Sequence, residues 1–326
     1  MVRRGRRPRD IIKAMITYDL IIIGGGPAGL SAAIYARRAN LSVLLIEESG
    51  DGGKLSKISK IDNYPGIESI SGFELAMNLV NHAKSYGTQI VNDKVIKIEN
   101  KAVKCASGEI YEGKTILIAT GSKQRKLDIP NASEYDGKGI SYCATCDGFF
   151  FKNKEVVVIG NNNQAFEESL YLTNLVSKLT IINRYDNLDG DETLLQAIAS
   201  NEKIEIINNV IPEELIIEDS KIVGIQIKDI NTNKTSNINC AGIFPYISFN
   251  PGTDFVDKEL IDDKGYIVTN QDMSTKMDGI FAAGDCIQKN LRQVVTACSD
   301  GAIAATSIIK YVKKWFRRPK SFLIIF

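Results

Sequence analysis

A glycine-rich turn near the start of the chain restricts the fold more than any other feature. Residues 20–23 form an apolar run, residues 24–29 read Gly-Gly-Gly-Pro-Ala-Gly, and a helical pattern follows. A second, mostly apolar run over residues 41–46 ends in Glu47, twenty-three residues after Gly24. Strand, glycine turn, helix and strand with a terminal acid are typical of a βαβ unit that holds a dinucleotide.

Each glycine of this turn has a separate expected role. Gly24 permits the tight turn, Gly26 lets the backbone approach a pyrophosphate, and Gly29 allows close packing of the helix. The helix N-terminus favours the phosphate charge, and Glu47 would accept hydrogen bonds from the adenosine ribose. The alternative is a structural glycine turn without a ligand, which the acid at the expected distance disfavours.

The same pattern begins again 136 residues later, at Gly160. An apolar run precedes this glycine, and a helical pattern and another strand follow it. The sequence therefore predicts an α/β fold with two nucleotide-binding, Rossmann-like domains of three-layer ββα form, the second inserted in the first. The expected ranges are 15–121 and 243–315 for the larger domain, 122–242 for the inserted domain, and 1–14 and 316–326 for the tails.

Two further helices are expected in the larger domain. Ser71 and Glu74 have the spacing of a capping box and open an amphipathic pattern that stops at Gly87. Residues 294–315 form a closing helix. In the inserted domain, the helix after Gly160 is expected to run from residue 164 to about residue 176.

The composition is that of a soluble enzyme. The 326 residues include 40 basic and 39 acidic side chains, so no charge excess suggests a nucleic-acid partner. No apolar run approaches the roughly 18 residues that cross a membrane, and the arginine-rich start does not lead into a signal-peptide core. We expect a cytoplasmic protein with no nucleic-acid and no membrane partner.

Cys143 and Cys146 form a Cys-x-x-Cys motif. Such a pair can be a redox dithiol, half of a zinc site or two unrelated buried cysteines. The sequence offers only isolated further cysteines and the single His82 as ligands, so we predict no metal site. The polar neighbours Thr145 and Asp147 favour a redox dithiol.

Asp147 is the candidate acid of this motif. Thiol-disulfide exchange needs a thiolate that attacks and a proton for the departing sulfur. Asp147 stands directly beside Cys146 and can supply that proton. The alternative is that Asp147 caps the start of a helix.

At this point the chain resembles a family over about residues 17–315, that of the low-molecular-weight thioredoxin reductases. The motifs that carry the resemblance are the first glycine turn, Gly52-Gly53-Lys54-Leu55, Asn63-Tyr64-Pro65-Gly66, Ala119-Thr120-Gly121, Cys143-Ala144-Thr145-Cys146-Asp147, Ala282-Ala283-Gly284-Asp285 and Arg292-Gln293, in the family's order. The resemblance implies a homodimer with a discontinuous FAD domain. A smaller domain would carry the dithiol and, in most members, NADPH, and thioredoxin would be the protein partner.

The resemblance also assigns residues to FAD. By it, FAD would be lined by Gly24, Gly26, Ala28, Gly29, Glu47, Gly53, Leu55, Asn63, Thr120, Gly121, Asp285, Arg292, Gln293 and Val294. Asp285 would contact the ribityl chain, and residues 292–294 the flavin end. Cys146 would lie nearest the isoalloxazine, which leaves Cys143 for exchange with thioredoxin.

The second glycine turn departs from the family pattern. Asn162 stands where the family usually has glycine, and a side chain there would obstruct a pyrophosphate. In the family, members that use NADPH have a sequence like His-Arg-Arg at the end of the next strand. This chain has Asn183-Arg184-Tyr185 there. Loss of most of the arginine contacts with the 2′-phosphate should make NADPH a poor ligand.

In this departure the chain resembles the ferredoxin-dependent flavin thioredoxin reductases. We therefore expect a cytoplasmic enzyme that passes electrons from reduced ferredoxin through FAD and the Cys143–Cys146 disulfide to thioredoxin, independently of NAD(P)H. One alternative is an NADPH-dependent thioredoxin reductase with a weakened nucleotide site. A flavin-dithiol redox sensor is the second alternative.

Overall fold

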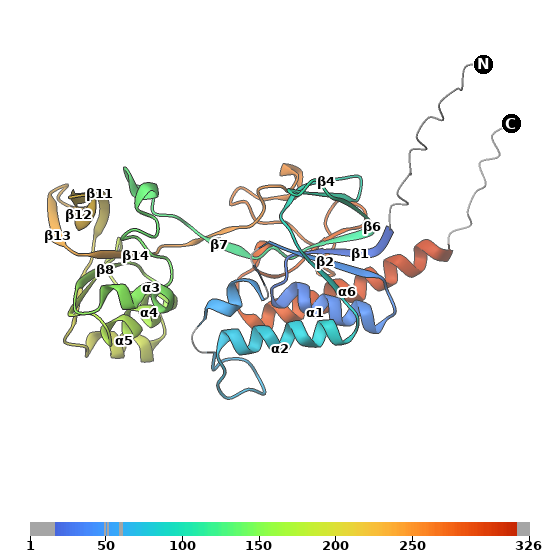
Figure 1. Cartoon of the computed structure of the whole chain (residues 1–326), viewed down its shortest axis with the longest axis horizontal. Helices are drawn as coiled ribbons and strands as arrows, with labels where there is room; N and C mark the ends of the chain where they lie inside the picture. Colours follow the sequence, from blue (N-terminus) through green and yellow to red (C-terminus); the bar gives the residue numbers. More distant parts are fainter. Residues whose placement is uncertain (1–16, 49, 51, 59–60, 318–326) are drawn as a thin grey trace, which may run out of the picture. The chain divides into compact units, whose positions relative to one another are not determined.

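The chain forms two compact units joined by two connections (Figure 1). The computed structural model describes residues 17–317 except 49, 51, 59 and 60. The larger unit takes the described residues up to Gly121 and from Pro251 onward, and the smaller unit is Ser122–Asn250. The return to the larger unit comes later than the expected residue 243, because residues 242–246 form a strand of the smaller unit. The predicted tails lie outside the described residues, except that the last helix continues to residue 317.

The larger unit is built on a seven-stranded sheet of order β3-β2-β1-β6-β5-β4, with β16 also paired to β6. Its strands are β1 (Thr17–Ile23), β2 (Val43–Glu47), β3 (Gln89–Asn92), β4 (Val95–Glu99), β5 (Ala102–Cys105), β6 (Ile110–Ile118) and β16 (Ile280–Ala282). The first half of β6 pairs antiparallel with β5 and its second half pairs parallel with β16. Because β5 and β16 pair with different halves of β6, the β4–β5 hairpin forms a separate layer. Figure 1 shows this layer opposite the helices.

Three long helices cover the other face of this sheet: α1 (Pro27–Arg38), α2 (Gly72–Ser85) and α6 (Val294–Arg317). Ser71 is the N-cap of α2, as the capping-box spacing predicts, since its Oγ accepts the N–H of Glu74 at 3.1 Å. Helices α1 and α6 pack without side chains between them at Gly301, where an added Cβ would lie 2.1 Å from the carbonyl oxygen of Ala28. This contact fixes the start of α1 against the second turn of α6.

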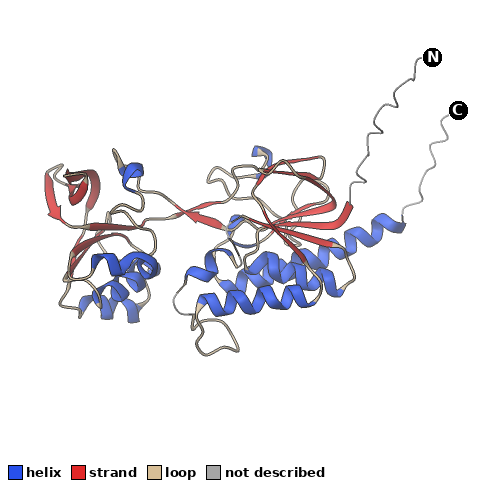
Figure 2. Cartoon of the chain, in the orientation of Figure 1, coloured by secondary structure: helices blue, strands red, loops and turns tan. Residues whose placement is uncertain are grey.

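The smaller unit has three layers (Figure 2). Its elements are α3 (Ala144–Asp147), β8 (Glu155–Gly160), α4 (Asn163–Thr173), β9 (Lys178–Ile182), α5 (Glu192–Ala199), β10 (Ile204–Ile207), β11 (Val210–Glu218), β12 (Lys221–Asp229), β13 (Thr235–Asn239) and β14 (Gly242–Tyr246). The parallel sheet has the order β10-β9-β8-β14, and the antiparallel sheet has the order β11-β12-β13. Alternate residues of β8 face different layers: Val156 and Val158 pack with the helices, and Val157 and Ile159 with the antiparallel strands. The predicted α/β class is confirmed.

The two connections between the units pair with each other. They are β7 (Ser122–Gln124) and β15 (Phe249–Pro251), which form a two-stranded sheet. Beside it, the N–H of Gly252 donates to the carbonyl of Gly121 at 3.0 Å. Short 3-10 helices complete the fold: η1 (Gly53–Lys57), η2 (Ala132–Tyr135), η3 (Gly148–Phe151), η4 (Lys258–Leu260) and η5 (Gly284–Cys286). Among the described helices, none combines the length and apolar character needed to span a bilayer.

Candidate active sites in the two units

The first glycine turn is required by the packing of the larger unit. Gly24 has a φ of +108°, and a Cβ there would lie 2.3 Å from the carbonyl oxygen of Ala119. At Gly29 a Cβ would lie 2.0 Å from the carbonyl oxygen of Gly24. Since neither contact can be relieved without moving backbone, both positions exclude a side chain even in the absence of a ligand.

Gly26 differs from these two glycines. It is the N-cap of α1, has an ordinary φ of −77°, and offers no side chain to cap the helix. A Cβ built on it meets nothing within 4 Å. The protein therefore leaves open space beside the N-terminus of a twelve-residue helix, where backbone N–H groups favour a phosphate. Gly53 borders the same space, 3.7 Å from Gly26 when a Cβ is built on it. These residues fit a bound dinucleotide.

Glu47 lies at the end of β2 and is buried, with 8% of its surface exposed. Its Oε2 accepts the N–H of Gly25, so the predicted ribose ligand also holds the glycine turn. Thr120 follows β6 and donates its hydroxyl to the carbonyl of Gly252 at 2.7 Å. The predicted residues thus lie where parallel strands end, which is the usual place for a ligand in such sheets.

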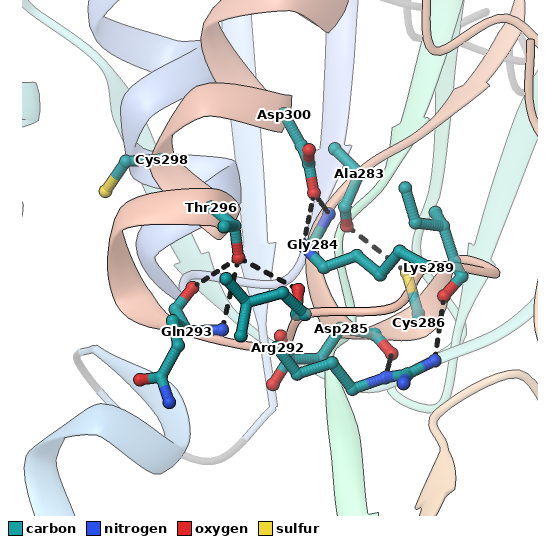
Figure 3. Close-up of polar contacts among 12 residues, drawn as sticks. Ala283, Gly284, Asp285, Cys286, Lys289, Arg292, Gln293, Thr296, Cys298 and Asp300 are labelled. Carbon is teal, nitrogen blue, oxygen red and sulfur yellow. Dashed lines mark hydrogen bonds and ion pairs between the residues drawn. The ribbon is translucent and has the colours of Figure 1, made fainter. Parts of the chain in front are cut away.

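The loop after β16 is held by a pair of charged residues that sequence reasoning missed (Figure 3). Asp300 Oδ2 accepts the N–H of Gly284 at 3.1 Å and lies 2.6 Å from Lys289 Nζ. Only 13% and 12% of these two side chains is exposed. Neither residue belongs to a recognisable motif, so only their contacts reveal that they position Asp285.

Arg292 braces the same loop from its other end (Figure 3). Its guanidinium donates to the carbonyls of Asp285 at 3.4 Å and Ile287 at 3.2 Å, and lies 4.1 Å from the ring centroid of Tyr266. The carboxylate of Asp285 pairs with Lys54 at 3.4 Å. Arg292, predicted to contact the flavin end, therefore also fixes the backbone that carries Asp285.

The remaining predicted flavin residues contact one another within the larger unit. Asn63 Nδ2 donates to Gln293 Oε1 at 3.3 Å, although 230 residues separate them in the chain. Leu55 is buried in a small apolar cluster, against which Val294 packs at the start of α6. Ala28 contacts Gly284, where an added Cβ would lie 2.9 Å from the Ala28 Cβ. The fold thus places this set of residues in one unit, at its loop edge.

The Cys-x-x-Cys motif lies in the smaller unit, where Cys143 and Cys146 form a disulfide. Cys143 caps the short helix α3, and its Sγ accepts the N–H of Cys146 at 3.2 Å. Thr145 Oγ1 lies 3.4 Å from the same sulfur. Donors aimed at one sulfur stabilise its thiolate, so the geometry favours Cys143 as the nucleophile of the reduced pair.

The other four cysteines are poorly suited to this chemistry. Burial raises the thiol pKa of Cys105 to about 11, of Cys240 to about 12 and of Cys286 to about 11. Burial also raises the pKa of Cys298. Thiols with such values carry little thiolate at neutral pH. Among the described residues, no group of three or more His, Cys, Asp or Glu side chains is arranged to hold a metal ion.

Asp147 is the last residue of α3, and its side chain makes no helix cap. Its Oδ2 instead accepts the hydroxyl of Ser141 at 2.6 Å, and Ser141 Oγ accepts the N–H of Cys143 at 3.1 Å. The alternative of a helix-start cap is therefore wrong. Ser141, which the sequence did not single out, links the candidate acid to the backbone of the candidate nucleophile.

The second glycine-type turn is capped by its own asparagine. Asn162 has an extended φ of −162°, which any residue adopts. Its Oδ1 accepts the N–H of Ala165 at 3.0 Å, and its Nδ2 donates to the carbonyl of Tyr246 at 2.8 Å. The side chain is thus folded into the protein, but it occupies one of the helix N–H groups that the corresponding turn of the larger unit leaves uncapped.

Two neighbouring asparagines attach the following loop to this turn. Asn161 binds the carbonyl of Asn187 at 3.2 Å and the N–H of Asp189 at 2.7 Å. Asn163 binds the N–H and the carboxylate of Asp191 at 2.8 and 2.7 Å. The loop after β9 is therefore fastened to the turn by at least four hydrogen bonds.

Comparisons with known proteins agree with this arrangement. The pyridine nucleotide-disulphide oxidoreductase family matches residues 18–301. Thioredoxin reductase of Bacillus subtilis (strain 168) is 42% identical over 302 residues, which cover 91% of this chain and 95% of that protein. The crystal structure of Lactococcus lactis thioredoxin reductase has a TM-score of 0.87 at 39% identity, covering 91% of this chain and 99% of that one.

A further solved structure is that of a ferredoxin-flavin thioredoxin reductase from Clostridium acetobutylicum. It is 34% identical with a TM-score of 0.51, and covers 93% of this chain and 100% of that one. The matched family segment includes the glycine turn, the disulfide and the whole loop that carries Asp285. The chain belongs to the pyridine nucleotide-disulphide oxidoreductase family.

Proposed function

We propose that the protein is a thioredoxin reductase that holds FAD in its larger unit and a redox-active Cys143–Cys146 disulfide in its smaller unit. The observation that carries the proposal is the disulfide itself, with a donor-stabilised sulfur and an adjacent acid, in a chain that also has an open dinucleotide turn at Gly26. The relatives named thioredoxin reductase, up to 42% identical, support the choice of thioredoxin as substrate.

Bound FAD would supply the transfer of an electron pair between a donor and the disulfide. The uncapped N-terminus of α1 beside Gly26 would bind the pyrophosphate, and Glu47 would bind the ribose. Asp285, held by Arg292 and by the Asp300–Lys289 pair, would bind the ribityl chain. These positions come from the family resemblance together with the open space at the turn.

The chain's own residues then carry out the exchange with thioredoxin. The Cys143 thiolate attacks the thioredoxin disulfide and forms a mixed disulfide, and Cys146 attacks Cys143 to release reduced thioredoxin. The departing sulfur of thioredoxin needs a proton, which Asp147 provides. Ser141 orients Asp147 through the 2.6 Å hydrogen bond.

A protein substrate suits the surface beside the disulfide. Phe149 and Phe150 follow Cys146 closely in the chain, and 69% and 70% of their surface is exposed. Adjacent exposed aromatic side chains are unfavourable in water unless a partner covers them. This surface favours an enzyme acting on a protein over the redox-sensor alternative. We also propose a homodimer, on the family resemblance alone.

The better supported electron donor is a pyridine nucleotide, which corrects the expectation that NADPH is unlikely. The description of the chain's family names a pyridine nucleotide. The smaller unit keeps a complete β8–α4–β9 unit, and Asn162 fits its turn without strain. Arg184 remains exposed after β9 to meet a 2′-phosphate. We therefore favour NADPH, bound at a weakened site.

Ferredoxin is the second candidate donor, and one observation favours it. The asparagines of the second turn bind the helix N–H of Ala165 and the loop after β9, which are the groups that a nucleotide would contact. The similar Clostridium acetobutylicum protein is named for ferredoxin and flavin. Such a donor would deliver electrons singly, which FAD tolerates.

Anaerobic reduction of the purified protein distinguishes these donors. Flavin absorbance is followed with NADPH, then NADH, then photoreduced ferredoxin, each with oxidised thioredoxin present. We expect rapid bleaching and thioredoxin reduction with NADPH. Bleaching by ferredoxin alone would show that ferredoxin is the donor, and the assignment as a thioredoxin reductase would stand. If no donor reduces thioredoxin through the flavin, the redox-sensor alternative would be favoured.

A further inference from the structure

The inference concerns Glu168, an acidic residue on the inward side of α4. Its neighbours Ala165 and Leu172, one turn away on either side, are fully buried. The Oε2 atom of Glu168 is inaccessible to solvent and has no hydrogen-bond partner among the residues that the structure describes. A buried carboxylate oxygen without a partner is costly, so this carboxyl binds a proton more readily than an exposed one.

The carboxyl of Glu168 faces the start of the helix that carries the disulfide. It lies beside the N–H of Ala144, the residue that follows Cys143. The same N–H donates to the hydroxyl of Tyr246 at 3.0 Å, and Tyr246 is 1% exposed. Glu168 thus lies next to the segment that contains the nucleophile.

Three ionisable groups influence this buried region. Glu167 adds a negative charge from α4 itself, Asp147 lies at the end of α3, and Tyr246 comes from β14. Burial is the main cause that raises the pKa of Glu168 to about 7, the charge of Glu167 raises it further, and the Ala144 N–H lowers it. With the disulfide formed, this carboxyl changes its charge near neutral pH.

Reduction of the disulfide adds a negative charge at this place. Cys143 Sγ is stabilised as a thiolate by the Cys146 N–H and lies one residue from Ala144. A thiolate and a carboxylate that both lie close to Ala144 repel each other, and the low dielectric of the interior strengthens the repulsion. The reduced unit therefore holds one of the two charges more easily than both.

We propose that Glu168 is the proton store of the dithiol, protonated when the Cys143–Cys146 disulfide is reduced and deprotonated when it is oxidised. Two electrons enter the disulfide and its S–S bond breaks. Cys146 receives one proton through Asp147, Cys143 remains a thiolate, and Glu168 takes one proton from water. The electrons come from the reduced flavin of the proposed reductase, and only this source rests on the proposed function.

The test measures the equilibrium between the full-length holoenzyme and dithiothreitol. Alkylation stops the exchange, and mass spectrometry gives the fraction of reduced enzyme. Dithiothreitol releases two protons when it is oxidised. If the enzyme takes up two protons when its disulfide is reduced, the equilibrium constant for this reduction is almost independent of pH between about 7.5 and 8.5. In Glu168→Gln the enzyme takes up one, so the constant should rise about tenfold per pH unit. A tenfold rise in the wild type, or a flat response in the variant, overturns the proposal.

A matched control is Glu202→Gln, since Glu202 is exposed elsewhere in the same unit. It should leave the response flat as in the wild type. Neither the electron donor nor thioredoxin takes part, so a wrong assignment of function would not alter these outcomes.

A measurement on the wild type covers the case in which Glu168→Gln does not fold. The infrared difference spectrum between the reduced and oxidised enzyme should gain one protonated-carboxyl band on reduction. The Glu202→Gln variant should keep that band. Its absence from the wild type overturns the proposal.

Discussion

The hydroxyl of Ser141 lies 2.6 Å from Oδ2 of Asp147, and its oxygen accepts the N–H of Cys143. The proposed acid is therefore tied to the backbone of the proposed nucleophile through a single side chain. Because Ser141 is 4% exposed, water competes little for these hydrogen bonds. The chemistry of the disulfide depends on a residue that stands outside the Cys-x-x-Cys motif.

Asp147→Asn should lower thioredoxin turnover by about 100-fold, because the amide cannot donate a proton in the same way. The flavin content should not change, since Asp147 belongs to the smaller unit. Steady-state turnover with thioredoxin and flavin absorbance measure both quantities. Ser141→Ala should keep the acid but lose its orientation, and so reduce turnover by less than Asp147→Asn. Equal turnover in wild type and Asp147→Asn would contradict the assigned role.

Gly26→Ala and Gly29→Ala should have different effects. A methyl group at Gly26 meets no protein atom within 4 Å, so we expect the apoprotein to unfold at an unchanged temperature while FAD affinity falls by at least tenfold. A methyl group at Gly29 collides with the Gly24 carbonyl, so the apoprotein itself should be less stable by several kcal/mol. Thermal unfolding and fluorescence titration with FAD separate the two effects. Tight FAD binding by Gly26→Ala would exclude this turn as the pyrophosphate site.

Lys289→Met should leave the Asp300 carboxylate without its cation at a site where both side chains are nearly buried. We expect a loss of about 3 kcal/mol in the free energy of unfolding. Flavin affinity should also fall, because Asp300 holds the N–H of Gly284 next to Asp285. The exposed pair of Lys178 and Glu205 provides the control, and Lys178→Met should cost less than about 1 kcal/mol in urea unfolding. Similar losses in the two variants would mean that burial of the first pair has no effect.

Glu168 should make stability depend on pH. Burial raises its pKa from 4.5 to about 7 in the folded protein. The folded state then binds this proton more tightly than the unfolded chain, so the contribution is complete below about pH 4.5 and is lost as pH rises through about 7. Relative to the wild type, Glu168→Gln should gain stability across this window, by on the order of 3 kcal/mol. Urea unfolding of both proteins at several pH values measures the difference. A constant difference would mean that Glu168 has an ordinary pKa.

Asn162→Gly should weaken the start of α4, because the hydrogen bonds to Ala165 and Tyr246 disappear. The expected loss of stability is about 1 kcal/mol. If NADPH binds at this turn, the freed N–H should lower the KM for NADPH. Asn161→Gly should release the loop after β9 without freeing that N–H. An unchanged KM in both variants, together with turnover on ferredoxin, would favour the second donor.

Local patterns were sufficient to predict much of the fold. The helices α1, α2 and α6 are confirmed, because a glycine turn marks the start of α1 and a strong apolar period marks α2 and α6. Helix α4 ends at Thr173, earlier than expected, because Asn174 Nδ2 binds the carbonyls of Leu170 and Tyr171. An asparagine that competes for helix carbonyls is visible in the sequence, but its rotamer is not.

The site residues without a motif could not be predicted in this way. Asp300 and Ser141 act on backbone N–H groups 16 and 2 residues away, and nothing in their local sequence indicates those contacts. Glu168 did leave a signal, since it is an acid between Ala165 and Leu172 on the apolar side of a helix. The contacts of Asn162 could not be predicted either, because the sequence does not show that its side chain turns inward to the protein.

The hydrogen bond between Gly121 and Gly252 has a consequence for the origin of this architecture. The main chain leaves and re-enters the larger unit at two backbone positions already in contact, so a single insertion of coding sequence at that point would be sufficient to combine the two modules. Replacing residues 122–251 by an Asn-Gly turn would make the bond between Gly252 and Gly121 the closing hydrogen bond of that turn. The larger module is thus topologically complete without the smaller one.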